Sequence, residues 1–499
     1  MKIFLTFGFG ASGGTSKYLT VNDHLKKKNM KYIFNLISYI NCLNLVYSQN
    51  LEPEMLFPDT LRSSTDSFVV TSSNFDNIYR QFISKKDTFN LGTAGYRGVY
   101  MKISTDIDTL IIAHTNFPND QLIKIPIASP NDTALCIIRF QGNISDFTNE
   151  YANKTKDTYK IEIPEIYELA NIILYLSQCS EKTNNHPLSE YASRVEEYFR
   201  PFKNHKLIQV LNNKCLSNNL WNTYYGFREN SICFEIEENN LQYKTPYKHV
   251  YFDGVQMNGG HFRNMSYLVQ DFLNQSKFQN FYNDNYSYYS KLIERQNQLL
   301  PIKQMWAWLE KEFPQRMDSY KIIFSPLIGG SHSTQKYLKG FFIRPEFQEC
   351  IMFINSPESV DAKTEYSEVL KKGLMSGIVF TEIDHNYVNP ASAKNFNAIK
   401  DLLKNKDIWA TKDAQEHYQS EYSIFNEYMT HSLFCLYINE SYNEEEGREI
   451  VNQRIKLMER RGFIKFEQFN DKLIHKLKVR KRTVYEMYAE VIEIMNEIK

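Results

Sequence analysis

The sequence predicts an α+β protein in which an N-terminal β-rich domain precedes a mainly helical domain with a small sheet. Residues 51–160 are rich in Thr, Ser, Ile and Val, and Asn-Asp and Pro-Asn turns separate their apolar runs. From about Ile163 the apolar residues instead recur with helical periodicity. Two later apolar runs, KIIFSPLIGG and ECIMFINS, have the length of buried strands. We therefore expect a leader over 1–48, a β-rich domain over 49–160 and a mostly helical domain over 161–499.

The N-terminal leader is expected to be removed from the mature protein. A signal peptide that starts at Met30 has Lys31 as its positive residue and the mostly apolar stretch 32–47 as its core. Val46 and Ser48 are small enough for a signal-peptidase cut after Ser48. This pattern predicts an exported protein, periplasmic or extracellular. A buried amphipathic helix is the alternative interpretation of the segment.

A glycine pattern in the leader allows another interpretation. Gly8, Gly10 and Gly13 have the GxGxxG spacing with which dinucleotide-binding folds approach a pyrophosphate. Such folds also need an acidic residue about 20 positions further on. The sequence there reads KKKNMKYIF, without an acid. A nucleotide-dependent enzyme is therefore only weakly indicated.

Strands are expected in the β-rich domain and helices in most of the remainder. The runs DTLIIAHT, LIKIPIA and TALCIIRF predict three strands. Pro164 suits the start of a helix through IYELANIILYLS, and further helices are expected over about Leu188 to Tyr198 and over 267–300. MWAWLEKEFP predicts a short helix that Pro314 ends.

Composition excludes several classes of protein. Hydrophobic residues make up 42% of the 499 residues and charged residues 23%, as in an ordinary globular protein. The 58 basic and 58 acidic residues cancel, which argues against a nucleic-acid binder that depends on bulk charge. No internal run is long and apolar enough to span a bilayer. No CxxC pair follows the leader, so buried free thiols are expected at Cys136, Cys179, Cys215, Cys233, Cys350 and Cys435.

The segment GIVFTEIDHNYVNP, residues 377–390, carries the strongest chemical signal. Read as a helix that ends at Asn389-Pro390, it places Glu382 and His385 three residues apart on one face. Zinc peptidases use His-Glu-x-x-His, in which two His bind the metal and the Glu accepts a proton from metal-bound water. Here Thr381 takes the place of the first His, Glu382 that of the general base and His385 that of the second ligand.

The segment FNEYMTHSLF, residues 425–434, predicts a second helix, which carries Glu427. One class of zinc peptidase takes a ligand from a Glu on a helix downstream of the first, and Glu427 fits that position. If both residues bind one ion, we expect the side chains of His385 and Glu427 within about 3–4 Å of each other. A buried salt bridge or a hydrogen bond from a Tyr is the alternative role for a carboxylate in this apolar setting.

Six segments of the chain together resemble a family of exported bacterial proteins. In order, they are PEIYELANIILYLS, EEYFRPFKNHKLIQVL, PLIGGSHST, FTEIDHNYVNP, FNEYMTHS and RRGFIKFEQFND. The family is described as a domain of unknown function, is typical of Bacteroidetes and is regarded as zincin-like; the resemblance covers the last two thirds of the chain. It implies a gluzincin-type metallopeptidase with Zn²⁺, Glu382 as base and His385 and Glu427 as ligands. Thr381 departs from the zincin pattern, because its hydroxyl is a poor zinc ligand.

A further ligand has to come from elsewhere if the site binds zinc. His332 ends the glycine-rich turn GGSH after a predicted strand, and such a turn can bring an imidazole close to a helix, so we expect His332 as the third ligand. His431 is the next candidate because it lies four residues after Glu427 on the same helix face. His205 and His261 are candidates without a spacing argument.

The sequence thus predicts an exported metal-dependent hydrolase, a peptidase that acts on peptide or protein substrates with Glu382 as general base. The alternative is a catalytically degenerate zincin-like relative that binds a protein or a glycan. The aromatic segment YNDNYSYYSK, residues 282–291, could supply a binding surface for that role, or its tyrosines pack along a helix.

Overall fold

A computed structural model describes most of the chain. It covers residues 55–56, 60–65, 67–72, 78–81, 88–91, 100–113, 122–131, 133–140, 143–183, 185–216, 220–247, 260–339, 346–418 and 420–498. The chain forms two compact units, Met1–Glu54 and Met55–Lys499. All of the residues that the structure describes belong to the second unit. The expected signal peptide and the GxGxxG pattern therefore lie outside the described residues.

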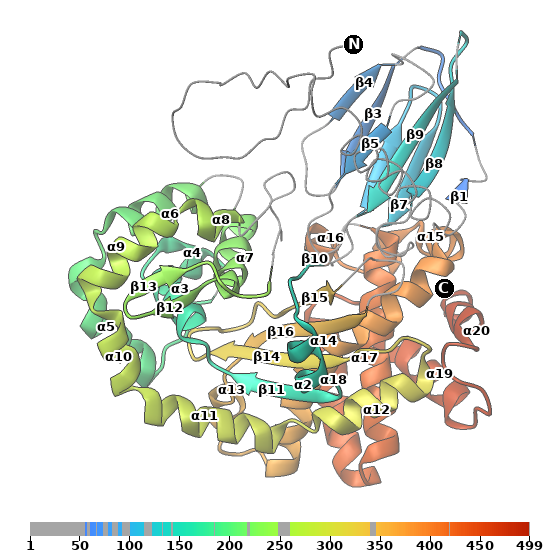
Figure 1. Ribbon diagram of the computed structural model, residues 1–499. Helices are drawn as coiled ribbons and strands as arrows, with labels where there is room; N and C mark the ends of the chain where they lie inside the picture. Colours follow the sequence, from blue (N-terminus) through green and yellow to red (C-terminus); the bar gives the residue numbers. More distant parts are fainter. Residues whose placement is uncertain are drawn as a thin grey trace, which may run out of the picture. The chain divides into compact units, whose positions relative to one another are not determined.

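The β-rich region contains two sheets. One has the order β1-β8-β9-β5, with β2 also pairing with β8, and the other has the order β4-β3-β6-β7 (Figure 1). The strands are β1 (Met55–Leu56), β2 (Leu61–Arg62), β3 (Ser67–Ser72), β4 (Ile78–Gln81), β5 (Thr88–Leu91), β6 (Tyr100–Ser104), β7 (Thr109–Ala113), β8 (Leu122–Ala128) and β9 (Thr133–Phe140). The three strands expected from β-branched runs are confirmed as β7, β8 and β9.

A third sheet, with the order β10-β15-β16-β14-β11, supports the candidate site. Its strands are β10 (Asn143–Ile144), β11 (Thr158–Glu162), β14 (Ser319–Ser325), β15 (Ser333–Lys339) and β16 (Phe347–Asn355). β11, β14 and β16 run parallel, and β15 runs antiparallel to β16 (Figure 1). β14 and β16 contain the two apolar runs expected to be buried strands, and almost all of their side chains are buried. Parallel strands covered on both faces need such continuous apolar sequences.

Helices and one short hairpin connect β11 to β14. The helices are α3 (Glu165–Tyr175), α4 (Gln178–Lys182), α5 (Glu190–Phe199), α6 (Lys206–Leu216), α7 (Leu220–Asn230), α8 (Gly260–Asn264), α9 (Ser266–Ser276), α10 (Phe278–Asp284), α11 (Tyr286–Leu299) and α12 (Ile302–Glu312), and the hairpin is β12 (Glu235–Glu237) with β13 (Asn240–Gln242). α2 (Asn149–Thr155) lies between β10 and β11. Pro164 is the N-cap of α3, as its fixed backbone angle and missing N–H favour.

A disulfide joins Cys179 on α4 to Cys215 on α6. The prediction of free thiols is therefore wrong for this pair, whose 36-residue separation gave no local signal. It is confirmed for Cys233, Cys350 and Cys435, which are buried and free.

The chain after β16 is helical. Its helices are α13 (Glu358–Asp361), α14 (Glu368–Lys394), α15 (Phe396–Leu403), α16 (Lys412–His417), α17 (Glu421–Ser441), α18 (Glu444–Arg460), α19 (Phe466–Lys478), α20 (Tyr488–Ile492) and α21 (Ile494–Glu497). The expected α+β class with a mainly helical C-terminal region is confirmed. None of the helices in the described part of the chain is long and apolar enough to cross a membrane.

The prediction that Asn389-Pro390 ends the first site helix is wrong. α14 continues to Lys394 with Pro390 inside it. Pro390 removes the helix hydrogen bond that its N–H would donate to the Asn386 carbonyl. The hydroxyls of Tyr422 and Tyr488 donate to the neighbouring carbonyls of Asn389 and Val388, at 2.9 and 3.4 Å, and anchor this stretch of α14 to the surrounding helices. Tertiary packing thus allows α14 to continue beyond Pro390, the residue at which the local sequence predicts its end.

Candidate functional site

Two buried helices bring the expected site residues together. α14 carries Glu382 and His385, and α17, which packs against it, carries Glu427. Side chains are buried on all sides of α17 over most of its length, as in a helix enclosed by the core. Nε2 of His385 lies 3.8 Å from Oε1 of Glu427. This distance is within the expected range, while the role of the two residues as metal ligands stays a prediction.

Glu427 is bound by an arginine. Nη2 of Arg461 donates to Oε2 of Glu427 at 2.7 Å, and Nε2 of His431 lies 3.4 Å from the same oxygen. Burial alone would raise the pKa of the Glu427 carboxyl, but Arg461, His431 and His385 together hold that pKa well below its usual range. Glu427 is therefore a carboxylate at neutral pH.

His431 lies between two guanidinium groups. Nη1 of Arg454 is 3.0 Å from its Nδ1, and Nη1 of Arg461 is 2.7 Å from its Nε2. Burial and the charges of the two arginines lower the pKa of His431 to about 3, although the contact with Glu427 opposes this shift. The imidazole is therefore neutral, and its two nitrogens face hydrogen-bond donors.

Local sequence explains how Arg461 reaches the site. Arg461 is the C-cap of α18, and Gly462 after it has φ +85°, a left-handed conformation that favours glycine at this position. The Gly462 carbonyl accepts from the N–H of Thr411 at 2.9 Å, which fixes the turn. The Arg461 side chain also donates to the hydroxyl of Tyr418.

Arg454 is placed by a glycine and an aromatic ring. Its guanidinium lies 4.6 Å from the ring centre of Phe434 and packs over Gly377 on α14, where a Cβ would overlap with it. Burial lowers the pKa of Arg454 to about 10, which still leaves it charged at neutral pH.

Asp384 adds an unusual carboxyl to this network. It is fully buried on α14, and neither of its side-chain oxygens has a hydrogen-bond partner among the residues that the structure describes. Burial, followed by the nearby charges of Glu427 and Glu382, raises the pKa of Asp384 well above its usual value, and Arg454 only partly opposes this. Asp384 is therefore harder to ionise than an ordinary aspartate.

Thr381 stands where the zinc-peptidase motif has its first His, and its hydroxyl donates to carbonyls of its own helix. Oγ1 of Thr381 donates to the carbonyls of Gly377 and Ile378, at 3.0 and 3.1 Å. Next to it, Glu382 is 8% exposed and thus largely covered by its surroundings.

The other expected histidines lie in different places. His332 is in the loop between β14 and β15, where Nη2 of Arg228 donates to the carbonyl of the preceding Ser331 at 2.9 Å. His205 is near the start of α6, with Nε2 3.0 Å from Oδ2 of Asp271. The side chain of His261 lies outside the described residues.

The donors present do not fit a bound metal. Within the described ranges, no three His, Cys, Asp or Glu side chains are arranged to hold an ion. Arg461 occupies one oxygen of Glu427, and it and Arg454 flank His431. A metal ion here would be repelled by the buried charge of Arg454 and the partly buried charge of Arg461. The expectation of His332 as third ligand gains no support, because the structure does not group it with His385 and Glu427.

The tyrosines of segment 282–291 mostly pack into the core. Tyr289 is buried, the hydroxyl of Tyr282 donates to the Ile163 carbonyl at 2.7 Å, and that of Tyr288 donates to Glu358 at 2.8 Å. Tyr286 is 63% exposed. The segment therefore offers a single exposed ring rather than an aromatic surface.

Sequence reasoning missed the two arginines of the site. Arg454 and Arg461 belong to the helix after the one that carries Glu427, so their separation from Glu427 in the sequence follows no helical period. The Arg460-Arg461-Gly462 sequence at a helix end was the available signal, because cations favour helix C-termini and glycine favours the position after them. No protein-family model, curated protein or solved structure matches this chain.

Proposed function

We propose that this chain is a catalytically degenerate zincin-like protein that acts as a binding module, with the Arg461 guanidinium where a zincin has its metal ion. The contact between Nη2 of Arg461 and Oε2 of Glu427, at 2.7 Å, is the observation that carries this proposal. A resident guanidinium supplies the positive charge that a buried carboxylate needs. The carboxylate is then stable without a metal.

Two further observations support a non-catalytic role. The Thr381 hydroxyl is bonded to its own helix, so the first ligand position is not available to an ion. The His431 nitrogens face Arg454 and Arg461, which removes the nearest replacement ligand.

A metal-dependent peptidase is the second candidate. It is favoured by the 3.8 Å distance between His385 and Glu427 and by the position of Glu382 on the same helix as His385. This function requires Arg461 to leave Glu427, and we derive no catalytic step from the arrangement described above.

Export is part of the proposal. The disulfide between Cys179 and Cys215 supports it, since stable disulfides are typical of oxidising compartments and rare in the cytosol.

Metal analysis of the purified full chain separates the two candidates. Wild-type protein equilibrated with Zn²⁺ and then desalted should retain much less than one equivalent, whereas Arg461→Met should retain more because Glu427 and His431 become accessible. Arg461→Lys keeps the charge and should behave like wild type, and Arg448→Met, on the exposed face of α18, is the matched control. Stoichiometric zinc in the wild type that is lost in Glu427→Ala would refute the proposal in favour of the peptidase.

A further inference from the structure

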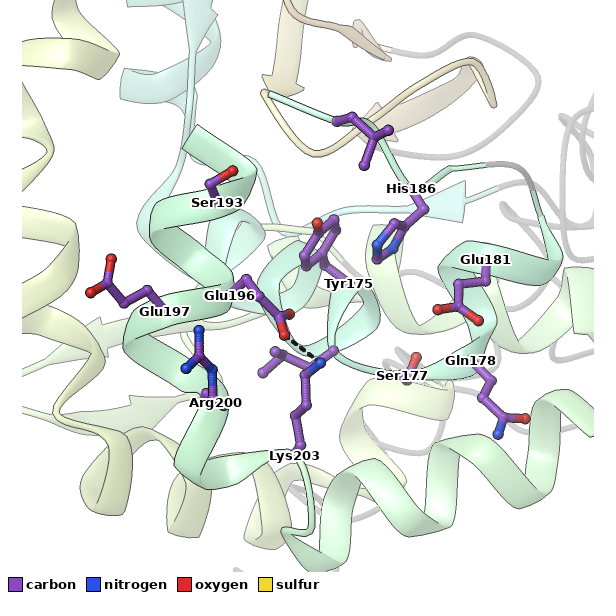
Figure 2. Close-up of a pocket in the computed structure, with 12 residues that line it drawn as sticks. Tyr175, Ser177, Gln178, Glu181, His186, Ser193, Glu196, Glu197, Arg200 and Lys203 are labelled. Atoms are coloured by element: carbon purple, nitrogen blue, oxygen red, sulfur yellow. Dashed lines mark ion pairs between the residues drawn. The ribbon is translucent and has the colours of Figure 1, made fainter. Parts of the chain in front are cut away.

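A second site lies at α3, α4 and α5, apart from the α14–α17 network. A cavity of about 550 Å³ is bordered by residues from the end of α3, from α4, from the segment before α5 and from α5 (Figure 2). This volume is within the range of about 300–1,000 Å³ that is typical of small-molecule sites. Such sites are usually apolar, whereas charged and polar side chains surround most of this one. The ligand that it fits is therefore polar.

Two stacked rings form one wall of the cavity. The rings of Tyr175 and His186 are parallel within 5°, with centres 4.1 Å apart. Nδ1 of His186 is 3.2 Å from the hydroxyl of Ser180, which orients the imidazole, and Tyr175 is buried at the end of α3. Figure 2 shows both rings at the centre of the lining residues. The wall is rigid and aromatic.

The polar groups around the rings include exposed charged side chains. Glu181 on α4 and Glu197 on α5 are exposed carboxylates, and Arg200 at the end of α5 is an exposed guanidinium. None of the three forms an ion pair with another described residue. Glu196 differs, since Lys203 binds it at 2.5 Å. Glu197 and Arg200 thus lie on one side of the aromatic wall, and Glu181 lies on the other (Figure 2).

We propose that this cavity binds a short neutral oligosaccharide, an inference that rests on the proposed binding function and names its site and ligand class. Sugar hydroxyl groups both donate and accept hydrogen bonds, so they match carboxylates and a guanidinium at the same time. The C–H face of a sugar ring packs on an aromatic ring, and the half-buried His186, stacked on the buried Tyr175, offers such a ring. A strongly anionic ligand is disfavoured by Glu181 and Glu197, and a strongly cationic one by Arg200.

The adjacent disulfide supports a prearranged site. Cys179 lies between Gln178, which lines the cavity, and Ser180, which orients His186. Its bond to Cys215 fixes α4 against α6, and the side chain of Asn212 on α6 accepts from the N–H of Gln178 at 2.8 Å. A rigid site loses less entropy when it binds a ligand.

The test uses the full chain on an array of immobilised short neutral oligosaccharides of glucose, galactose and N-acetylglucosamine, with acidic and basic peptides as further probes. The best glycan is then titrated by calorimetry into wild type, Arg200→Gln and Glu197→Gln. Each substitution should weaken binding by about tenfold or more, the usual effect of losing a hydrogen bond to a charged group. Glu190→Gln, an exposed change on α5 outside the cavity lining, is the matched control and should bind as wild type does.

Two results would overturn the inference. In the first, the chain binds a peptide on the array but no neutral glycan. In the second, the glycan binds equally well to wild type and to both pocket variants. Neither result changes the zinc measurement proposed above. Conversely, zinc binding by the wild type would refute the degenerate-site proposal without changing the glycan affinities expected in the titration. The two failures are therefore distinguishable.

Discussion

Arg461 and Glu427 form a partly buried ion pair in which Nη2 of the arginine lies 2.7 Å from Oε2 of the glutamate. The pair joins the end of α18 to the middle of α17, 34 residues apart in sequence. It defines the chemistry of the site, because His385, His431 and Arg454 are all arranged around it.

Breaking this pair should destabilise the fold strongly. Arg461→Met leaves a buried carboxylate without its main partner and should lower the free energy of unfolding by about 3–5 kcal/mol. The double variant Arg461→Met with Glu427→Met should lose less than the sum of the single changes, because no charge is left unpaired. Urea unfolding of the four proteins measures the coupling energy. Additive losses would show that the contact is not a coupled pair.

His431 should make stability depend on pH. Its folded pKa is about 3 against an ordinary 6.5, so the unfolded chain binds more protons at this residue between those values. The stability it contributes is present above pH 6.5 and is lost as pH falls through this window, by about 1.4 kcal/mol per pH unit at most. Glu427, with its lowered pKa, adds a loss of the same sign below its ordinary value of 4.5.

The variant His431→Asn isolates this contribution. Asp384 acts in the opposite sense, since its raised pKa favours the folded state when the solution is acidic. Both proteins contain Asp384, so the difference between wild type and His431→Asn cancels its effect. As the pH is lowered from 7 to 5, the free energy of unfolding should fall less steeply in His431→Asn than in wild type. Equal slopes would contradict a neutral, buried His431.

Restoring the missing motif His should not suffice to build a zinc site. Thr381→His supplies an imidazole four residues before His385, the spacing that suits tetrahedral zinc, but Arg461 still holds Glu427. We expect Thr381→His combined with Arg461→Met to bind zinc more tightly than either single variant, and Thr381→His alone to bind it no better than wild type, as measured by competition with a chromogenic chelator. Tight binding by Thr381→His alone would mean that the guanidinium does not block the site.

Gly377 should be intolerant of a side chain. A Cβ there overlaps with the Arg454 guanidinium and touches the ring of Phe434, so Gly377→Ala should cost about 1–3 kcal/mol of stability through overpacking. Gly330 is the matched control, because no atom lies within 4 Å of a Cβ at that position. Thermal unfolding of both variants tests this packing, and similar melting temperatures would argue against it.

The sequence predicted the local parts of this protein better than the distant ones. The Glu-x-x-His spacing and the helix around Glu427 match the zinc-peptidase pattern, and this match predicted that His385 and Glu427 lie close together, as they do at 3.8 Å. Helical periodicity alone fixes only the face of each helix on which these residues lie. Arg461 enters from a turn beyond the next helix, and no periodic rule connects it to Glu427. α14 likewise continues through Pro390 in a stretch that contacts hydroxyl groups from α17 and α20, which are distant in sequence.

The Cys179–Cys215 bond has a consequence for how the chain withstands proteolysis. The cavity residues between Glu181 and Lys203, including His186 and Arg200, all lie inside the loop that this bond closes. A single cut of the backbone anywhere in that loop leaves two fragments that stay covalently joined through sulfur. The backbone and the disulfide both connect the two sides of the cavity. A single backbone cut between α4 and α5 therefore leaves the two sides covalently joined.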